Sequence, residues 1–511
     1  MKPATIPAVL RAAAVKFGDS EALADGPLRL GFGQLLERVQ LVARAFAASG
    51  VRPGDRVAVV LPNTAAWVLS ALGALYTGAV LVPVNTRFTG AETVDLLVRS
   101  RASALVVAAD FLGTDRYAAI RATGTELPEL TTVVRVPLEQ PHTPVPGTLG
   151  WDEFLARGDG VPVAEVEARA DAVRPDDVSD ILFTSGTTGR SKGVLSAHRQ
   201  VVEVAEAWAG CGRVRAADRY LVVNPFFHSF GYKAGIVVCL LTGAAIVPQA
   251  VFTAADTLEV IERERISVLP GAPTIFQSLL PERAGRDLSS LRLAVTGAAS
   301  VPASLVRRMR AELGFETVLT AYGLTEAVVV TMCRPGDDAG LVAATSGRAT
   351  AGFEVALRAP AGEVVVRGPN VMLGYLDDPE ATAQAVDGEG WLRTGDVGVL
   401  DEAGNLAITG RVKDMYICGG FNVYPAEIEH ALAELAGVRD VAVIGVADER
   451  LGEVGKAFVV RSGGLSAEAV LGFCRGRLAN YKVPRSVEFV AELPRNASGK
   501  VLKRLLSKEK A

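Results

Sequence analysis

The sequence predicts an α/β protein whose last hundred or so residues form a different, smaller α+β unit. Short runs rich in valine, isoleucine and leucine recur between helix-like segments along most of the chain. Residues 57–86 contain no charged side chain, and proline and glycine divide this run into strand, helix and strand. After Gly410 the regular alternation stops and a basic tail closes the chain. A βαβ-type core with an appended unit accounts for all three observations.

The expected elements follow in chain order. In the first two-fifths of the chain we expect strands at 57–61, 80–84 and 104–107, with a helix over 65–76 and a proline-rich surface loop over 137–150. The middle should hold a helix from 234 to about 242 and strands at 221–223, 244–247, 268–269, 293–295 and 318–319. The last part should hold a helix beginning near 425, strands at 441–444 and 457–460, and a helix over 466–478.

Composition excludes some function classes. The 511 residues are 49% hydrophobic and carry a net charge of −4, so the chain can bury a large core and nothing suggests a nucleic-acid partner. The five cysteines are scattered without any Cys-x-x-Cys spacing, so we expect neither disulfides nor a zinc site, and a reducing cytoplasm is the expected location. Proline and glycine divide the uncharged runs into elements that are too short to span a bilayer. We therefore expect buried strands and helices and no transmembrane segment.

The segment from Ile181 to Val194 predicts a phosphate-binding loop. A short apolar strand leads directly into hydroxyl side chains, glycines and one lysine. Glycines let successive backbone N–H groups point at one anion, hydroxyls add donors, and a lysine adds a positive charge. The loop is not a Walker A motif, because Arg190 and Ser191 separate Gly189 from Lys192. Its candidate ligands are Thr184, Ser185, Gly186, Thr187, Thr188, Gly189 and Lys192.

This loop resembles the signature of the AMP-forming adenylating superfamily, which includes acyl-CoA synthetases, peptide-synthetase adenylation domains and beetle luciferases. Further segments resemble the superfamily's motifs in the same order, so the resemblance covers nearly the whole chain. These segments are Asn224–Gly231, Thr296–Ala299, Tyr322–Glu326, Gly390–Asp396, Gly410–Asp414 and Pro494–Lys500.

The resemblance implies a two-step reaction that uses ATP, Mg²⁺ and CoA. The carboxylate attacks the α-phosphorus to give acyl-AMP and pyrophosphate, and positioned cations matter more than a nucleophile in this step. Glu326 and Thr184 are the implied magnesium ligands, and both are assigned catalytic roles. Nucleotide contacts fall to the phosphate loop and to Gly297, Ala298, Ala299, Tyr322, Gly323, Thr325, Asp396 and Arg411, of which Asp396 is expected to bind the ribose hydroxyls.

The end of the chain carries the remaining implied machinery. Lys500 resembles the superfamily's adenylation lysine, which bridges the carboxylate and the α-phosphate during charge development. The resemblance divides the chain into an ATP- and acyl-binding domain, 1–412, and a mobile domain, 413–511, hinged at Lys413. After rotation a channel for CoA is expected beside Gly419, Gly420 and Phe421.

The expected acid is neutral and apolar. The segment after Asn224 carries no carboxylate that would bind a substrate amine, and His228 is expected to gate the pocket. The acyl-pocket candidates are His228, Phe230, Tyr232, Gly235, Thr274, Ala327 and Val329. Long segments around His228 and Met415 resemble the actinobacterial fatty-acid–CoA ligase group, which includes the ligase for the indanedione propanoate left from steroid rings C and D. The bulky run 327–330 departs from the expectation for that ring acid, so a medium-chain or branched fatty acid is an equal alternative.

Two other functions compete at this stage. An adenylation enzyme that loads a carrier protein would use the same motifs, although no carrier domain is fused to this chain. A non-catalytic AMP-binding protein would not need Thr188, Glu326, Asp396 and Lys500 together. The sequence leaves open whether the protein is a monomer or a homodimer.

Overall fold

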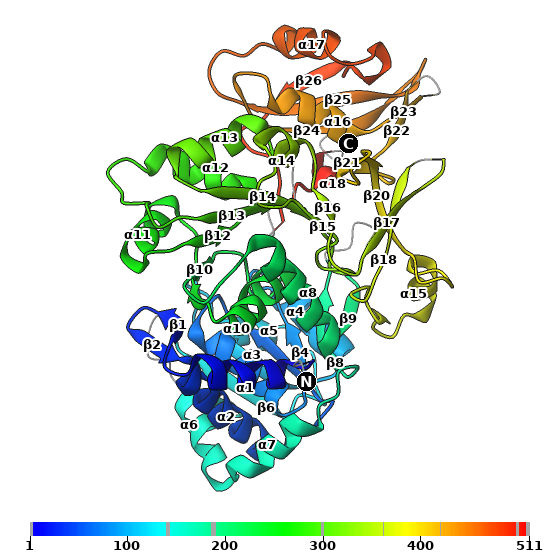
Figure 1. Cartoon of the computed structure of the whole chain (residues 1–511). Helices are drawn as coiled ribbons and strands as arrows, with labels where there is room; N and C mark the ends of the chain where they lie inside the picture. The colour runs from blue at the N-terminus through cyan, green and yellow to red at the C-terminus, as the bar shows by residue number, and fades with distance from the viewer. Residues whose placement is uncertain are drawn as a thin grey trace.

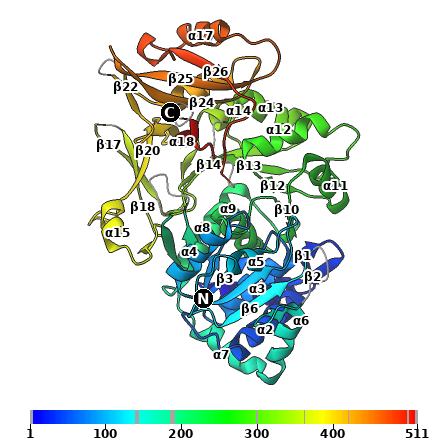
Figure 2. The ribbon, with the colours of Figure 1, turned by 180° about the vertical axis from the view of Figure 1, so that it is seen from behind.

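The computed structural model describes residues 4–138, 144–184, 191–297, 301–360, 362–418, 421–496 and 500–506. Four sheets in this part of the chain organise the molecule. In Figure 1 the N-terminal elements lie at the bottom, the middle of the chain above them, and the C-terminal elements at the top. The view from behind shows the same order (Figure 2).

The first large sheet has the order β19-β9-β8-β4-β3-β5-β6-β7. Its strands from β8 to β7 are parallel, while β9 and β19 run antiparallel to their neighbours. The bounds are β3 Arg56–Val60, β4 Val80–Pro83, β5 Ala102–Ala108, β6 Thr132–Val136, β7 Leu149–Gly150, β8 Val178–Phe183, β9 Gly193–Ala197 and β19 Gly374–Tyr375.

The second large sheet has the order β16-β15-β14-β13-β12-β10-β11-β1-β2. In this order the strands from β14 to β1 are paired in parallel, while β15, β16 and β2 each pair antiparallel with their neighbours. The bounds are β1 Glu21–Asp25, β2 Leu28–Gly31, β10 Arg219–Val222, β11 Ala245–Pro248, β12 Val268–Pro270, β13 Leu293–Gly297, β14 Thr317–Tyr322, β15 Thr331–Met332 and β16 Arg348–Ala349.

A continuous hydrophobic core joins the two large sheets through the helices between them. The helix α3 (Ala65–Tyr76) is apolar on all sides, and all its residues except Ala66 are buried, as expected for a helix enclosed by protein. It begins where the Thr64 hydroxyl accepts a hydrogen bond from the Trp67 N–H. The strand–helix–strand unit expected over residues 57–86 is therefore confirmed.

The remaining helices cover these sheets. They are α1 Ile6–Phe17, α2 Phe32–Ala48, α4 Gly90–Ser100, α5 Arg116–Arg121, α6 Trp151–Arg157, α7 Val163–Ala172, α8 His198–Gly212, α9 Ser229–Gly231, α10 Val238–Thr242, α11 Ala254–Glu264, α12 Pro273–Glu282, α13 Ala303–Glu312 and α14 Ala339–Ala344. Short 3₁₀ turns lie at Gly158–Gly160 and Asn480–Lys482. The helix expected from residue 234 is partly wrong, because Tyr232–Val237 forms a π-helical turn before α10 begins.

A small antiparallel sheet corrects a second expectation. The alternation of strands and helices does not continue to residue 410; instead β17 (Glu354–Arg358), β18 (Glu363–Arg367), β20 (Leu392–Leu400) and β21 (Leu406–Arg411) form a sheet in that order. The helix α15 (Pro379–Ala385) lies between β19 and β20 in the chain. Charged cross-strand partners such as Glu354 and Arg367 are typical of a sheet with one solvent-exposed face. A search for the continuous apolar runs of buried parallel strands does not detect such a sheet.

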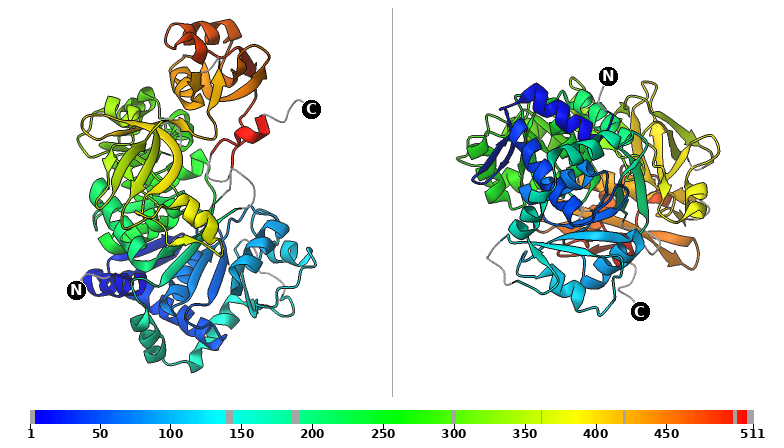
Figure 3. Two further views of the ribbon diagram at one scale, coloured as in Figure 1. Left: turned by 90° about the vertical axis from the view of Figure 1, so that its right-hand side faces the viewer. Right: turned by 90° about the horizontal axis from the view of Figure 1, so that it is seen from below.

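The C-terminal unit contains a sheet of the order β23-β22-β25-β24, with β26 beside β25. Its elements are β22 Tyr416–Cys418, β23 Phe421–Val423, α16 Pro425–Ala433, β24 Val438–Asp448, β25 Gly452–Arg461, α17 Ala467–Arg475, β26 Ser486–Phe489 and α18 Lys503–Leu506. Figure 3 shows this unit above the rest, with the chain that leads to α18 passing between them.

Two further observations on the described residues concern membrane-spanning helices and the cysteines. None of the helices in the described residues has the length and apolar character that crossing a bilayer requires. The five cysteines are free thiols, and each is buried.

Candidate active site

One cleft of about 2770 Å³ lies where the two large sheets, the small sheet and the C-terminal unit meet. The carboxyl ends of β12, β13 and β14 open into it, as in other open α/β sheets that bind ligands at that edge. Most of the expected site residues in the described chain line it: Thr184, Lys192, His228, Phe230, Thr274, Gly297, Tyr322, Gly323, Thr325, Glu326, Val329, Asp396, Arg411, Lys413 and Lys500.

The phosphate loop connects two antiparallel strands. β8 and β9 pair up to Phe183 and Gly193, and the Thr184 N–H donates to the Lys192 carbonyl at 2.9 Å. This bond closes the base of the loop and brings Thr184 and Lys192 to the cleft. The expected ligands Ser185, Gly186, Thr187, Thr188 and Gly189 lie outside the described residues.

Glu326 is held by a tyrosine that the sequence alone did not single out. The Tyr375 hydroxyl donates to Glu326 Oε1 at 2.9 Å, and Lys192 Nζ lies 4.6 Å from the centre of the Tyr375 ring. Burial and the neighbouring Glu326 raise the pKa of Tyr375 far above its usual value, so the phenol keeps its proton. This bond leaves the second carboxylate oxygen, Oε2, as an acceptor for a cation.

Two glycines allow close backbone packing at the ends of β13 and β14. A Cβ on Gly297 would lie 2.4 Å from the Ala321 carbonyl oxygen, and a Cβ on Gly323 would lie 1.7 Å from that of Val328. Both positions therefore require glycine. Val328 has a φ of 59°, an uncommon conformation for a β-branched residue, and it turns the chain back toward the cleft. Ala298 and Ala299 lie outside the described residues.

Asp396 forms the centre of a three-residue cluster. It is 4% exposed, Arg411 Nε lies 2.7 Å from its Oδ1, and the Tyr322 hydroxyl donates to its Oδ2 at 2.6 Å. Burial and the Asp396 charge raise the pKa of Tyr322 well above its usual value, so Tyr322 is a donor. A carboxylate has about four acceptor positions, so two remain for a pair of hydroxyl groups.

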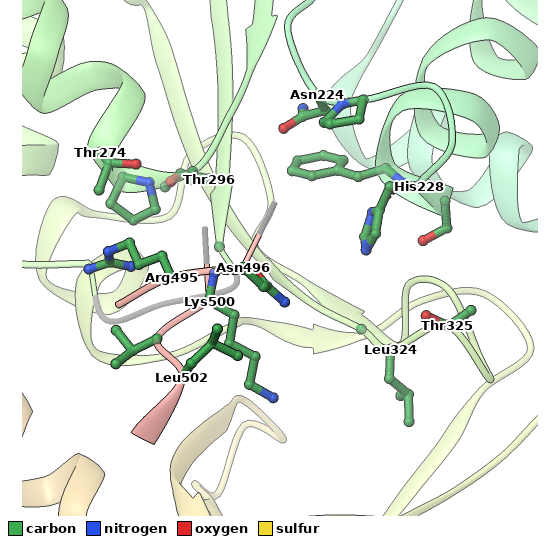
Figure 4. Close-up of a pocket in the computed structure, with 18 of the residues that line it drawn as sticks. Asn224, His228, Thr274, Thr296, Leu324, Thr325, Arg495, Asn496, Lys500 and Leu502 are labelled. Carbon is green, nitrogen blue, oxygen red and sulfur yellow. Dashed lines mark hydrogen bonds between the residues drawn. The ribbon is translucent and has the colours of Figure 1, made fainter. Parts of the chain in front are cut away.

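Lys500 approaches this cluster from the C-terminal unit. Its backbone is fixed by Asn496, whose side-chain oxygen accepts from the Lys500 N–H at 2.8 Å. Burial, and then the nearby Arg411 charge, lower the pKa of Lys500, while Asp396 and Asp414 act in the opposite direction. Figure 4 shows Lys500 on the C-terminal segment, across the cleft from Asn224 and His228.

His228 is neutral in this site. The Phe230 N–H donates to its Nδ1 at 3.2 Å, so the ring proton is assigned to Nε2. Burial, and secondarily the Lys233 charge, lower the pKa of His228 to about 4. A neutral imidazole with its N–H directed away from its own backbone can donate one hydrogen bond to a ligand in the cleft.

The apolar part of the cleft differs from the expected set. Of the acyl-pocket candidates, His228, Phe230, Thr274 and Val329 line the cleft. Tyr232, Gly235 and Ala327 do not, and each is wrong as a lining residue because it is buried against protein. The Tyr232 ring centre lies 5.8 Å from that of Trp67, a Cβ on Gly235 would meet Val222, and Ala327 packs into the core beneath the small sheet.

Trp208 is a lining residue that the sequence patterns did not indicate. It lies on α8 and meets the Phe230 ring edge-on, with ring centres 5.4 Å apart. Val204, one helical turn before it, lines the cleft as well. The i, i+4 spacing of this apolar pair signals a buried helix face, but it cannot distinguish a face on the core from a face on a ligand pocket.

Of the described residues expected at the hinge and the CoA channel, Lys413 lines the cleft and Phe421 does not. Lys413 is exposed in the turn that joins β21 of the small sheet to β22 of the C-terminal sheet. Phe421 is 57% exposed and its ring stacks on Tyr481 with centres 4.6 Å apart. Gly419 and Gly420 lie outside the described residues.

Comparisons with known proteins agree along the whole chain. A family model described as AMP-binding enzyme matches residues 10–376, and one described as AMP-binding enzyme C-terminal domain matches residues 427–500. A Rhodococcus jostii (strain RHA1) protein named 3-[(3aS,4S,7aS)-7a-methyl-1,5-dioxo-octahydro-1H-inden-4-yl]propanoyl:CoA ligase is 59% identical, covering 100% of this chain and 99% of that protein. A protein of the same name from Mycobacterium tuberculosis (strain ATCC 25618 / H37Rv) is 56% identical, with 98% and 97% covered. The crystal structure of the anthranilate CoA ligase AuaEII in complex with anthranoyl-AMP superposes with a TM-score of 0.89 at 28% identity, with 98% and 96% covered.

Proposed function

From the premise that this chain belongs to the AMP-binding enzyme family and is an AMP-forming acid–CoA ligase, we propose that its acid is an alicyclic keto propanoate. The full-length similarity to two relatives named as ligases for the methyl-dioxo-octahydroindenyl propanoate is the observation that carries the proposal. These relatives use CoA by name, which disfavours a carrier protein as the acyl acceptor.

The cleft supports an apolar acid of this kind. Phe230 and Trp208 line the cleft with their ring planes 72° apart, and Ile275 and Val329 add aliphatic surface. Such walls bind a hydrocarbon ring by burying its surface. A medium-chain fatty acid is the second candidate, because the Val328–Val329 pair places branched side chains where a bulky ring would otherwise fit.

We propose a role for each of the polar residues that line the cleft. Lys500 stabilises charge on the α-phosphate as the carboxylate attacks, and Asp396 accepts hydrogen bonds from the ribose hydroxyls. His228 directs its Nε2–H at the carboxylate. The chain from Lys413 onward is proposed to rotate as a domain once acyl-AMP has formed, so that Lys500 leaves and the thiol of CoA enters beside Phe421.

Glu326 and Thr184 fit a magnesium ion together with ATP. Both residues line the cleft and supply the oxygen ligands that Mg²⁺ prefers. Tyr375 binds Glu326 Oε1, which leaves Oε2 for the ion. No cluster of three or more metal-binding side chains occurs among the described residues, which suits Mg²⁺ because this ion takes many of its ligands from phosphates and water. When bound, the ion neutralises phosphate charge.

A panel of acids tests the proposal. The purified protein with ATP, Mg²⁺ and CoA should form the thioester of the indanyl propanoate with a kcat/KM at least about tenfold above that for octanoate or a branched medium-chain acid, the discrimination expected of one or two methylene-sized contacts. A preference for octanoate of the same size would support the second candidate. Acyl transfer only to a phosphopantetheinylated carrier protein would contradict CoA as the acceptor.

A further inference from the structure

The structure contains a fully buried ion pair that the proposed reaction does not use. Lys233 Nζ lies 2.8 Å from Asp180 Oδ1, and the two side chains are 1% and 0% exposed. Lys233 Nζ also donates to Ser196 Oγ at 2.7 Å. Charges are rarely buried this deeply, because removing two ions from water costs several kcal/mol per ion.

The pair joins two structures that both face the cleft. Asp180 and Ser196 are cross-strand partners on β8 and β9, the hairpin whose loop begins at Thr184 and ends at Lys192. Lys233 therefore contacts both strands of the hairpin, four residues before Thr184 on β8 and four residues after Lys192 on β9. The Ser179 hydroxyl donates to the other Asp180 oxygen at 2.7 Å.

Lys233 belongs to the π-helical turn Tyr232–Val237 that follows His228. Phe230 and Ala234, on either side of this lysine, line the acyl part of the cleft, while Tyr232 and Lys233 are buried away from it. Ala234 of the turn and Phe230 before it thus line the cleft, while Lys233 contacts the hairpin. π-Helical turns are rare and are frequent at functional sites.

Aromatic side chains pack at the start of the turn that carries Lys233. The rings of Phe226 and Tyr232 both pack on Trp67, with centres 5.0 and 5.8 Å apart. In such surroundings the attraction between two ions is strong and directional, but desolvation offsets it, so an apolar pair of the same size often gives equal or higher stability. Unlike an apolar pair, an ion pair fixes a single geometry between the two segments.

We infer that Lys233 is a positioning residue for acyl-AMP formation, which holds the acid-binding segment His228–Ala234 in register with the phosphate-binding hairpin through Asp180 and Ser196. This inference rests on the proposed reaction. Adenylation joins an acid oxygen to the α-phosphorus, so the two segments must hold their ligands within reacting distance. A displacement of about 1 Å between bound groups costs on the order of 10²-fold in rate.

The double variant Asp180→Asn/Lys233→Met tests the inference, because it removes both charges while preserving side-chain size. Its melting temperature should stay within a few degrees of wild type. The kcat of acyl-AMP formation should fall about 10- to 100-fold. The KM for ATP and the rate of thioester formation from supplied acyl-AMP should each change less than about threefold, whereas simple loss of folded protein would lower both half-reactions equally.

A matched control uses another buried ion pair of the same domain. Asp218→Asn/Arg292→Met neutralises a pair that does not line the cleft, and it should leave both half-reactions unchanged. If the first double variant unfolds, Ser196→Ala decides, since it removes only one partner of Lys233 and should lower the adenylation kcat several-fold without affecting the supplied-intermediate step. Wild-type adenylation in either folded variant would overturn the inference. Failure of the wild-type protein to form acyl-AMP from any acid would instead overturn the proposed function.

Discussion

Replacing Val329 with alanine should change which acids the enzyme prefers. Val329 is 4% exposed and lines the cleft, so its two methyl groups contact either protein or bound acid. Each buried methylene-sized group contributes about 0.8 kcal/mol, and at 4% exposure at most one methyl group of Val329 can face a bound acid, so that acid loses up to about 0.8 kcal/mol, or about fourfold in kcat/KM. A straight-chain acid should lose this contact, while a bulky ring gains room.

The assay compares kcat/KM for octanoate and for the indanyl propanoate in both proteins. Val329→Ala should shift the ratio about fourfold toward the ring acid. Val330→Ala is the matched control, because Val330 is the next residue, is fully buried, and packs beneath the small sheet without lining the cleft. An unchanged ratio in Val329→Ala, or the same shift in Val330→Ala, would refute the assignment of Val329 to the acyl pocket.

Three other predictions concern the role of Lys500, the pH dependence of stability and the proposed hinge at Lys413. Lys500→Ala should lower acyl-AMP formation about 10²- to 10³-fold while leaving thioester formation from supplied acyl-AMP near wild type, and Lys503→Ala should do neither; a loss confined to ATP affinity would contradict the role of Lys500. Burial lowers the pKa of His198 to about 4 from an ordinary value of 6.5, so between these pH values only the unfolded chain binds the proton and the free energy of unfolding falls by up to about 3 kcal/mol as the pH drops. His198→Gln should flatten this part of the pH dependence in urea unfolding, and an identical pH dependence in the variant would show that the pKa of His198 does not change on folding. Lys413→Pro should impair adenylation more than thioester formation, because Lys413 is the third residue of the turn closed by the hydrogen bond from the Asp414 N–H to the Arg411 carbonyl, and proline at this position would disrupt the turn; equal loss of both steps would argue against a hinge here.

The buried parallel strands were the most predictable part of the fold. Runs such as residues 57–61 are continuously apolar because both faces of a parallel sheet are covered, and few structures other than a buried strand produce so short an apolar run between turn residues. The small antiparallel sheet was missed for the opposite reason. Its strands mix exposed and buried positions, and pairs such as Glu354 with Arg367 are adjacent only once the register is known.

The residues of the site also divide into those that could be predicted from the sequence and those that could not. Residues in glycine-rich motifs, such as Gly297 and Gly323, were predictable because backbone packing forbids any other residue there. Apolar pocket residues were not predictable. Tyr232 and Trp208 are both aromatic residues, and only the tertiary structure shows that Tyr232 faces the core and Trp208 the cleft. Tyr375 was missed since its partner Glu326 is distant in the chain.

The fate of a carboxylate oxygen tests the central claim most directly. If the acid attacks the α-phosphorus of ATP and CoA then displaces AMP, one oxygen of the acid must leave with AMP. An acid labelled with heavy oxygen in its carboxylate should therefore give AMP that carries one heavy oxygen, in equal amount to the acyl-CoA formed. Unlabelled AMP, or ADP with the label in inorganic phosphate, would contradict formation of acyl-AMP.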